Sequence, residues 1–127
     1  MKDRMGREID YMRFSITDRC NLRCKYCMPE GIDCMPRWDV LSLEEFEAIA
    51  IAAASLGIKK IKVTGGEPLA RKSCPQLVKM LKNIPGIEKV TLTTNGVQLD
   101  QYLDQLLDAG LDAINVSLDT VDPVLYE

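Results

Sequence analysis

Three segments of the chain repeat one short pattern, and this repeat limits the possible folds more than any other feature. Each copy reads glycine, apolar, two variable residues, apolar, polar, apolar, hydroxyl; the copies are 57–64, 86–93 and 110–117. They start 29 and 24 residues apart, about the length of one strand–helix unit. Because glycine favours the left-handed conformation that follows a helix, each copy predicts a helix end followed by a strand.

The segments before each copy carry helical patterns. A capping box of Ser42 and Glu45 predicts the start of the first helix, and the second is expected to start near Ser73 and Pro75. The apolar residues aligned on the three helices are Leu43, Phe46, Ile49, Ala50 and Ala53, then Leu77, Leu81 and Ile84, then Leu99, Tyr102, Leu103 and Leu106. With an earlier strand at 11–17, this order predicts an α/β fold of about four parallel strands and three helices with right-handed crossovers.

Alternate residues of the expected strands separate into an apolar face and a polar face. The apolar face, expected under the helices, comprises Met12, Phe14, Ile16, Ile61, Val63, Val90, Leu92, Ile114, Val116 and Leu118. The polar face comprises Arg13, Ser15, Thr17, Lys60, Lys62, Thr64, Thr91, Thr93, Asn95, Asn115, Ser117 and Asp119. A closed eight-stranded barrel or a doubly wound sheet would bury both faces. The pattern favours a partial (β/α) barrel whose concave side holds a polar ligand; the alternative is a sheet whose second face is simply solvated.

The charge distribution and the lengths of the apolar stretches argue against several classes of function. A net charge of −3 gives no support for a general nucleic-acid-binding surface, although residues 1–29 carry seven basic and four acidic side chains, so a local anion site is possible there. The longest apolar stretch, 48–56, is too short to cross a membrane. Residues 1–10 are charged and lack the apolar segment of a secretory signal, so we expect a cytoplasmic protein.

The chain has five cysteines and no histidine. Without histidine, catalytic triads, histidine-containing zinc sites and imidazole acid–base chemistry are excluded for this chain. An odd number of cysteines suits a disulfide framework poorly and indicates reduced thiols that bind a metal.

Three of these cysteines, Cys20, Cys24 and Cys27, lie within eight residues after the first strand. Closely spaced thiolates hold iron–sulfur clusters, and three ligands leave one iron of a cubane open to a substrate or cofactor. The basic residues of this loop, which favour deprotonated thiolates, are Arg19, Arg23 and Lys25. The alternative is a zinc site completed by Cys34. Otherwise we expect Cys34 and Cys74 to be structural or incidental, since a buried free cysteine is a common small hydrophobe.

The spacing Cys-x-x-x-Cys-x-x-Cys resembles the signature of the radical S-adenosylmethionine (SAM) superfamily. Four strings taken in order, at 17–30, 64–68, 92–96 and 115–119, resemble more closely the GTP 3′,8-cyclase family of molybdenum cofactor biosynthesis. The cysteine motif alone indicates only the superfamily, whereas the four strings together are specific. The similarity covers 11–127 and corresponds to the N-terminal part of that family's chain.

This resemblance implies a role for individual residues. The implied ligands of a [4Fe-4S] cluster are Cys20, Cys24 and Cys27. The implied SAM-binding residues are Tyr26, Gly65, Gly66, Glu67 and Ser117. The implied GTP-binding residues are Arg13, Lys62 and Thr93. Tyr26 would lie against the adenine, and the Gly-Gly-Glu turn would meet the methionyl amine. The family commonly has arginine where this chain has Lys62, so a bidentate phosphate contact is lost here.

The resemblance also implies a reaction. SAM bound to the open iron would yield a 5′-deoxyadenosyl radical that takes the 3′ hydrogen of GTP, and the substrate radical would close onto C8 of guanine. Such a lyase needs an electron donor and a downstream enzyme that takes the cyclised nucleotide. The resemblance also makes a homodimer one of the alternatives for its assembly. No membrane or nucleic-acid partner is expected. The alternatives are another radical SAM enzyme, such as a peptide maturase, and a non-catalytic zinc module.

The resemblance further divides the chain into an N-terminal arm, 1–10, and the first part of a radical SAM core, 11–127. In the family, two further βα units and a segment with a second cluster follow. We therefore expect this chain alone not to turn over GTP, and detection of the cyclised nucleotide with it would refute that expectation.

Overall fold

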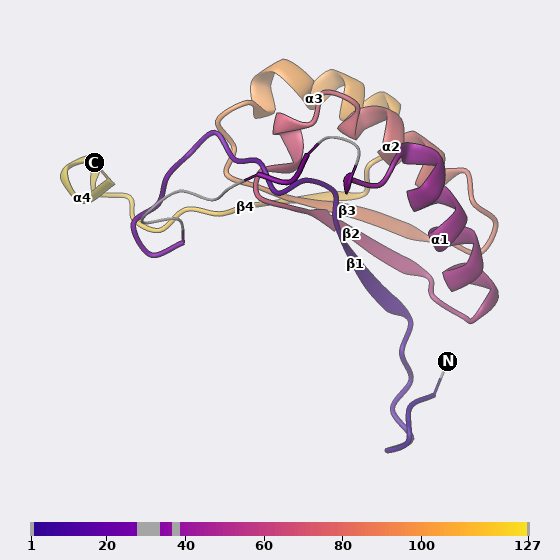
Figure 1. Ribbon diagram of the computed structural model, residues 1–127. Helices are drawn as coiled ribbons and strands as arrows, with labels where there is room; N and C mark the ends of the chain where they lie inside the picture. The colour runs from indigo at the N-terminus through magenta and orange to yellow at the C-terminus, as the bar shows by residue number, and fades with distance from the viewer. Residues whose placement is uncertain (1, 28–33, 37–38, 127) are drawn as a thin grey trace.

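The protein forms one four-stranded parallel sheet with its three longer helices on one face (Figure 1). The computed structural model describes residues 2–27, 34–36 and 39–126. The strands, in the sheet order β1-β2-β3-β4, are β1 (Tyr11–Ser15), β2 (Lys60–Thr64), β3 (Lys89–Thr94) and β4 (Ala113–Val116). The helices are α1 (Leu43–Ser55), α2 (Cys74–Lys82), α3 (Leu99–Asp108), a short α4 (Pro123–Tyr126) and a 3₁₀ turn, η2 (Pro68–Ala70). The α/β fold, the parallel sheet and the order of the main elements are as the repeat predicts.

Local chemistry sets the ends of the helices as the sequence predicts. The Ser42 hydroxyl accepts a hydrogen bond from the Glu45 amide, and the Glu45 carboxylate accepts one from the Ser42 amide, so the capping box is complete at α1. Each repeat glycine follows a helix with a positive φ, namely 97° at Gly57, 96° at Gly86 and 84° at Gly110. These left-handed residues turn the chain from each helix into the next strand.

The apolar face of β1, β2 and β3 forms the core beneath α1 and α2. Phe14 and Phe46 pack with ring centroids 5.2 Å apart, and Leu77 and Leu81 of α2 are fully buried. Fully burying a side chain of this size contributes about 1.5–3 kcal/mol relative to leaving it exposed. The core therefore anchors the strands from one side and leaves their other side free for the polar residues.

Four residues expected in the core are exposed. Ile49 is 41% exposed. Because α1 packs beside α2, the stripe of α1 residues that is buried is narrower than predicted, and Ile49 lies outside it. Leu103 on α3 is 36% exposed for a similar reason, since α3 packs beside α2. Val116 and Leu118 are 53% and 60% exposed. The edge strand β4 has no neighbour on its outer side, and within the described ranges no helix covers its end.

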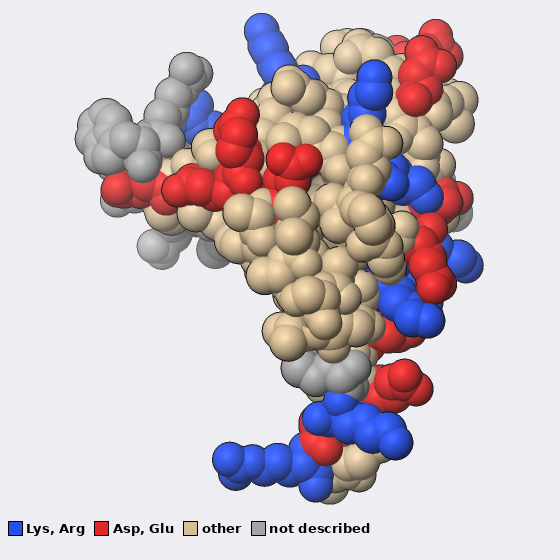
Figure 2. All heavy atoms as spheres, turned by 90° about the vertical axis from the view of Figure 1, so that its right-hand side faces the viewer, with Lys and Arg blue, Asp and Glu red and all other residues tan. Residues whose placement is uncertain are grey.

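The segment before β1 lies outside the sheet and points away from it (Figure 1). A single bridge joins Lys2 and Glu8, and Arg7 pairs with Asp3 at 2.7 Å. Figure 2 shows lysine and arginine side chains gathered at the lower end of the molecule, where this segment lies. Within the described ranges, none of the helices has the length and apolar character that crossing a bilayer requires.

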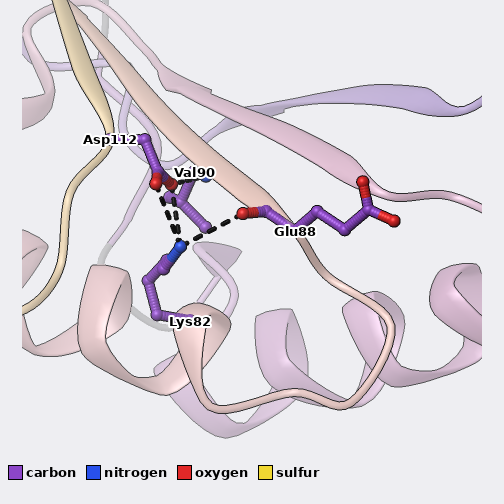
Figure 3. A network of polar contacts seen from close by, with 4 residues as sticks. All are labelled: Lys82, Glu88, Val90 and Asp112. Atoms are coloured by element: carbon purple, nitrogen blue, oxygen red, sulfur yellow. Dashed lines mark hydrogen bonds and ion pairs between the residues drawn. The ribbon is translucent and has the colours of Figure 1, made fainter.

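A polar network joins the end of α2 to the starts of β3 and β4 (Figure 3). The Lys82 ammonium donates to the Asp112 carboxylate at 2.9 Å and to the Glu88 carbonyl at 3.2 Å. The Val90 amide donates to the same carboxylate at 2.7 Å. Desolvation raises the pKa of Asp112, but the hydrogen bonds from Lys82 and Val90 outweigh it, so the pKa is lowered overall. The network fixes where β4 starts beside β3.

Replacing Asp112 with asparagine should therefore reduce stability in a pH-dependent way. A carboxyl group whose folded pKa lies below its unfolded value, about 3.9, stabilises the fold above that value and loses this contribution as the pH falls through the folded pKa. We expect D112N to lower the free energy of unfolding by about 1 kcal/mol at pH 7 and by less at pH 3. Urea unfolding at both pH values measures this.

The control is E88Q, which removes the exposed ion pair between Lys59 and Glu88 but leaves the Glu88 carbonyl in place. It should change stability by less than about 0.5 kcal/mol. A D112N effect that is equal at both pH values would contradict the electrostatic explanation.

Candidate functional site

Several segments that carry predicted site residues lie at the carboxyl ends of the strands. The cysteine loop follows β1, the Gly-Gly-Glu turn follows β2, Asn95 follows β3 and Asp119 follows β4. Parallel strands place these connections at one edge of the sheet, where α/β proteins bind their ligands. In Figure 1 the loop after β1 and the segment around α4 both lie beyond this edge, on the side opposite the N-terminus.

The turn after β2 is hydrogen-bonded directly to the start of the cysteine loop. The Gly66 amide donates to the Thr17 carbonyl at 2.7 Å, and the Glu67 amide donates to the Arg19 carbonyl at 2.7 Å. A Cβ atom at Gly65 would lie 2.7 Å from the Thr17 carbonyl oxygen, and one at Gly66 would lie 2.8 Å from that of Asp18. The two glycines are thus required for close packing of this turn against the loop that carries the cysteines.

The Glu67 side chain joins the turns after β2 and β3. It is 1% exposed, and its carboxylate accepts hydrogen bonds from the Leu69 amide at 3.1 Å, the Thr94 hydroxyl at 2.7 Å and the Asn95 amide at 2.7 Å. A buried carboxylate is costly unless it is fully hydrogen-bonded, and these three donors meet that need. The sequence predicts that Glu67 contacts a cofactor amine, but its buried position does not support that contact. In this turn, the backbone at Gly66 is the part exposed to solvent.

The three loop cysteines are free thiols, with Cys20 and Cys24 half-buried and Cys27 exposed. The Cys20 Sγ accepts a hydrogen bond from the Leu22 amide at 3.4 Å, and the Cys27 amide donates to the Cys24 carbonyl at 2.9 Å. Across the part of the chain that is described, no three histidine, cysteine or acidic side chains converge to hold a metal ion. In donor chemistry, three accessible thiols on one short loop fit an iron–sulfur cluster, because such clusters are held by thiolates.

The other two cysteines differ from each other. Cys74 is fully buried at the start of α2, and burial, assisted by the negative charge of Glu67, raises the pKa of its thiol to about 12. It therefore stays protonated and unreactive, as expected of a small core residue. Cys34 is exposed, so the expectation that it is buried is wrong. Its flanks lie partly outside the described residues, and it does not belong to the hydrophobic core that the described residues form.

Tyr26 reaches from the cysteine loop to the segment after β4. Its side chain is 77% exposed, and its hydroxyl donates to the Asp119 carboxylate at 3.2 Å. The hydrogen bond to Asp119, followed by the negative charge of that carboxylate, raises the pKa of Tyr26. An open groove of 340 Å³ runs between the two segments, lined by residues that include Cys24, Lys25 and Tyr26. This volume lies in the range of small-molecule sites.

Ser117, the last predicted SAM contact, is exposed at the end of β4.

The predicted GTP residues share the open face of the sheet. Arg13 on β1 lies directly across from Lys62 on β2, and Lys62 lies across from Thr91 on β3, while Thr93 is two residues further along β3. Within the described chain neither Arg13 nor Lys62 has an ion pair. Two neighbouring cations without an acidic partner repel each other, so this row favours an anionic ligand.

Three residues of this region, Arg71, Asn95 and Asp119, make contacts that the sequence does not predict. Asn95 and Asp119 lie on the polar face that the alternation identifies. Asn95 contacts Asn21, 74 residues away, and Asp119 contacts Tyr26, 93 residues away. Arg71 donates to the Ile16 carbonyl at 2.8 Å and the Leu41 carbonyl at 2.9 Å, which joins β1 to the segment before α1. Such long-range pairings leave no periodic signal in a sequence.

Comparisons with known proteins show which superfamily the chain resembles. The radical SAM superfamily profile matches residues 14–127. A GTP 3′,8-cyclase of Peptoclostridium acidaminophilum is 51% identical over 98% of this chain, and one of Alkaliphilus metalliredigens is 52% identical over the whole chain. This chain spans 39% and 40% of those two relatives.

A solved structure shows the same fold. The crystal structure of BtrN in complex with AdoMet and 2-DOIA matches with a TM-score of 0.69 at 23% identity, covering 87% of this chain and 46% of that one. The predicted partial barrel is confirmed by this match and by the four-stranded sheet. Because the superfamily profile covers nearly all of the sequence from β1 onwards, the chain belongs to the radical SAM superfamily.

Proposed function

We propose that this chain is the N-terminal part of a radical SAM GTP 3′,8-cyclase, a cytoplasmic lyase of molybdenum cofactor biosynthesis. The observation that carries the proposal is the identity of about half, over almost the whole chain, to curated relatives that bear this name. The unpaired cations on the open face of the sheet support it, since the substrate of such an enzyme is a triphosphate.

In this proposal Cys20, Cys24 and Cys27 hold a [4Fe-4S] cluster, and SAM completes it. When bound, the cluster and SAM supply hydrogen-atom abstraction, a reaction that no side chain of the protein provides. The chain's own residues bind and orient. The Gly65–Gly66 turn presents backbone groups to the methionyl end of SAM. Tyr26, which lines the groove, and Ser117, exposed at the end of β4, contact SAM.

The substrate in this proposal lies on the polar face of the sheet. Arg13 and Lys62 offset the triphosphate charge. Thr93 lies two residues beyond the position across from Lys62, nearer the cysteine loop, and offers a hydroxyl there. Lysine binds phosphate as a point charge, so this site holds the triphosphate less rigidly than one with arginine at 62. The electron donor, a second cluster in the remainder of the protein, a homodimer and a downstream enzyme for the product belong to the same proposal.

Charge reversal at Lys62 should weaken GTP binding strongly. We expect K62E to raise the Kd for GTP by about 10- to 100-fold, because a charge-assisted contact is replaced by repulsion. Equilibrium dialysis of GTP against the anaerobically reconstituted chain measures this.

The matched control is K60A, on the same strand and face. The Lys60 ammonium already pairs with Asp10 at 2.9 Å and lies nearer the start of the strand, so K60A should leave the Kd within about twofold. Equal GTP binding by K62E and K60A would contradict the nucleotide site, and binding of a peptide in place of GTP would favour a peptide-modifying radical SAM enzyme.

A further inference from the structure

Asn95, at the end of β3, is held in one orientation by three contacts. Its backbone amide donates to the buried Glu67 carboxylate at 2.7 Å. Its side-chain oxygen accepts a hydrogen bond from the Val97 amide at 3.1 Å, and its side-chain nitrogen donates to the Asn21 side-chain oxygen at 2.8 Å. The Val97 donor fixes which end of the amide is oxygen, so the nitrogen must face the cysteine loop.

The amide nitrogen of Asn95 carries two protons, and Asn21 takes only one of them. The same nitrogen lies 4.0 Å from the Cys20 Sγ. The Leu22 amide also donates to this sulfur at 3.4 Å. Among the described contacts, Cys20 is the one loop cysteine whose sulfur receives hydrogen bonds, and it receives two.

We propose that Asn95 is a positioning residue whose side-chain amide donates a hydrogen bond to the Cys20 thiolate and thereby raises the reduction potential of the cluster bound there. The inference rests on the proposed function, since it concerns a cluster held by Cys20. A donor to a ligand sulfur stabilises the reduced, more negative form of the cluster more than the oxidised form. Glu67 contributes by fixing the Asn95 backbone, which explains why a buried carboxylate stands between the ends of β2 and β3.

The test compares midpoint potentials of the reconstituted chain in three variants. N95A removes the amide without adding charge, and N95D keeps an oxygen for the Val97 amide while losing both donors. Cluster reduction is followed by electron paramagnetic resonance in samples poised at a series of potentials. We expect the ratio of reduced to oxidised cluster in N95A to fall about tenfold at a fixed potential, a shift of ~59 mV to more negative values, with a larger shift in N95D.

The control variant is N21A, which removes the other partner of the Asn95 amide and leaves the Asn95 donors in place. Its potential should stay close to that of the parent chain. If N21A shifts the potential as far as N95A, Asn95 acts only by holding the loop, and the hydrogen bond to sulfur is refuted. An unchanged potential in both N95A and N95D refutes the inference while the proposed function stands. Failure of the parent chain to assemble any cluster instead refutes the proposed function, and the inference with it.

Discussion

Substituting alanine for Gly66 is expected to destabilise the fold by about 3 kcal/mol and to prevent stable cluster binding. The added methyl carbon would lie 2.8 Å from both the Asp18 carbonyl oxygen and the Arg19 carbonyl carbon. These are backbone atoms, and they are tied to the same turn by the bond from the Glu67 amide to the Arg19 carbonyl. The turn after β2 must therefore separate from the cysteine loop. Urea unfolding and the iron content after anaerobic reconstitution measure the two effects.

The matched control is Gly110→Ala. Gly110 has a φ of +84°, so alanine there is strained. Among the described residues, its Cβ would meet just the Lys82 side chain, at an ordinary 3.7 Å. We expect a loss of about 1 kcal/mol and unchanged iron content. Equal loss of iron in both variants would show that the cluster follows overall stability and that the contact between the turn and the loop has no special part in it.

Replacing any one of Cys20, Cys24 and Cys27 by alanine is expected to abolish the cluster. A cubane held by two protein thiolates in place of three lacks a corner ligand, and thiolates are the ligands that such clusters require. The iron-to-chain ratio and the visible absorption of the reconstituted protein measure the loss.

The matched controls are C34A and C74A. Cys34 lies outside the three-cysteine motif, and Cys74 is a buried thiol with a pKa raised to about 12, so neither is expected to supply a ligand. C74A can lower stability because it leaves a cavity in the core, but the protein that remains folded should bind iron as before. Loss of iron in C34A with retention in C27A would contradict the assignment of the ligands and favour a different set.

Much of the fold follows from local rules. The capping box at Ser42, the glycines after each helix and the alternation along the strands all depend on near neighbours, and the structure has each of them where the sequence predicts. The exposed Ile49 and Val116 are errors of another kind. Periodicity identifies which residues share a face, but whether that face is covered depends on which elements pack beside it, and β4 is an edge strand.

The candidate site is predicted less completely. The polar face of the sheet follows from alternation, and it brings Arg13 and Lys62 side by side. The role of Glu67 could not be predicted, because its partners Thr94 and Asn95 lie 27 and 28 residues further along the chain. The same holds for Gly66, which a turn motif suggests is needed for a ligand and which the structure shows packed against the Asp18 and Arg19 backbone.

The central claim is that three thiols of one loop hold an iron–sulfur cube with one iron left for SAM. Anaerobic reconstitution of the full chain with iron and sulfide, followed by electron paramagnetic resonance of the reduced protein with and without SAM, tests this directly. We expect about four iron atoms per chain and a spectrum that changes when SAM is added. A colourless chain that takes up one zinc ion, or a cluster whose spectrum is the same with and without SAM, would contradict it.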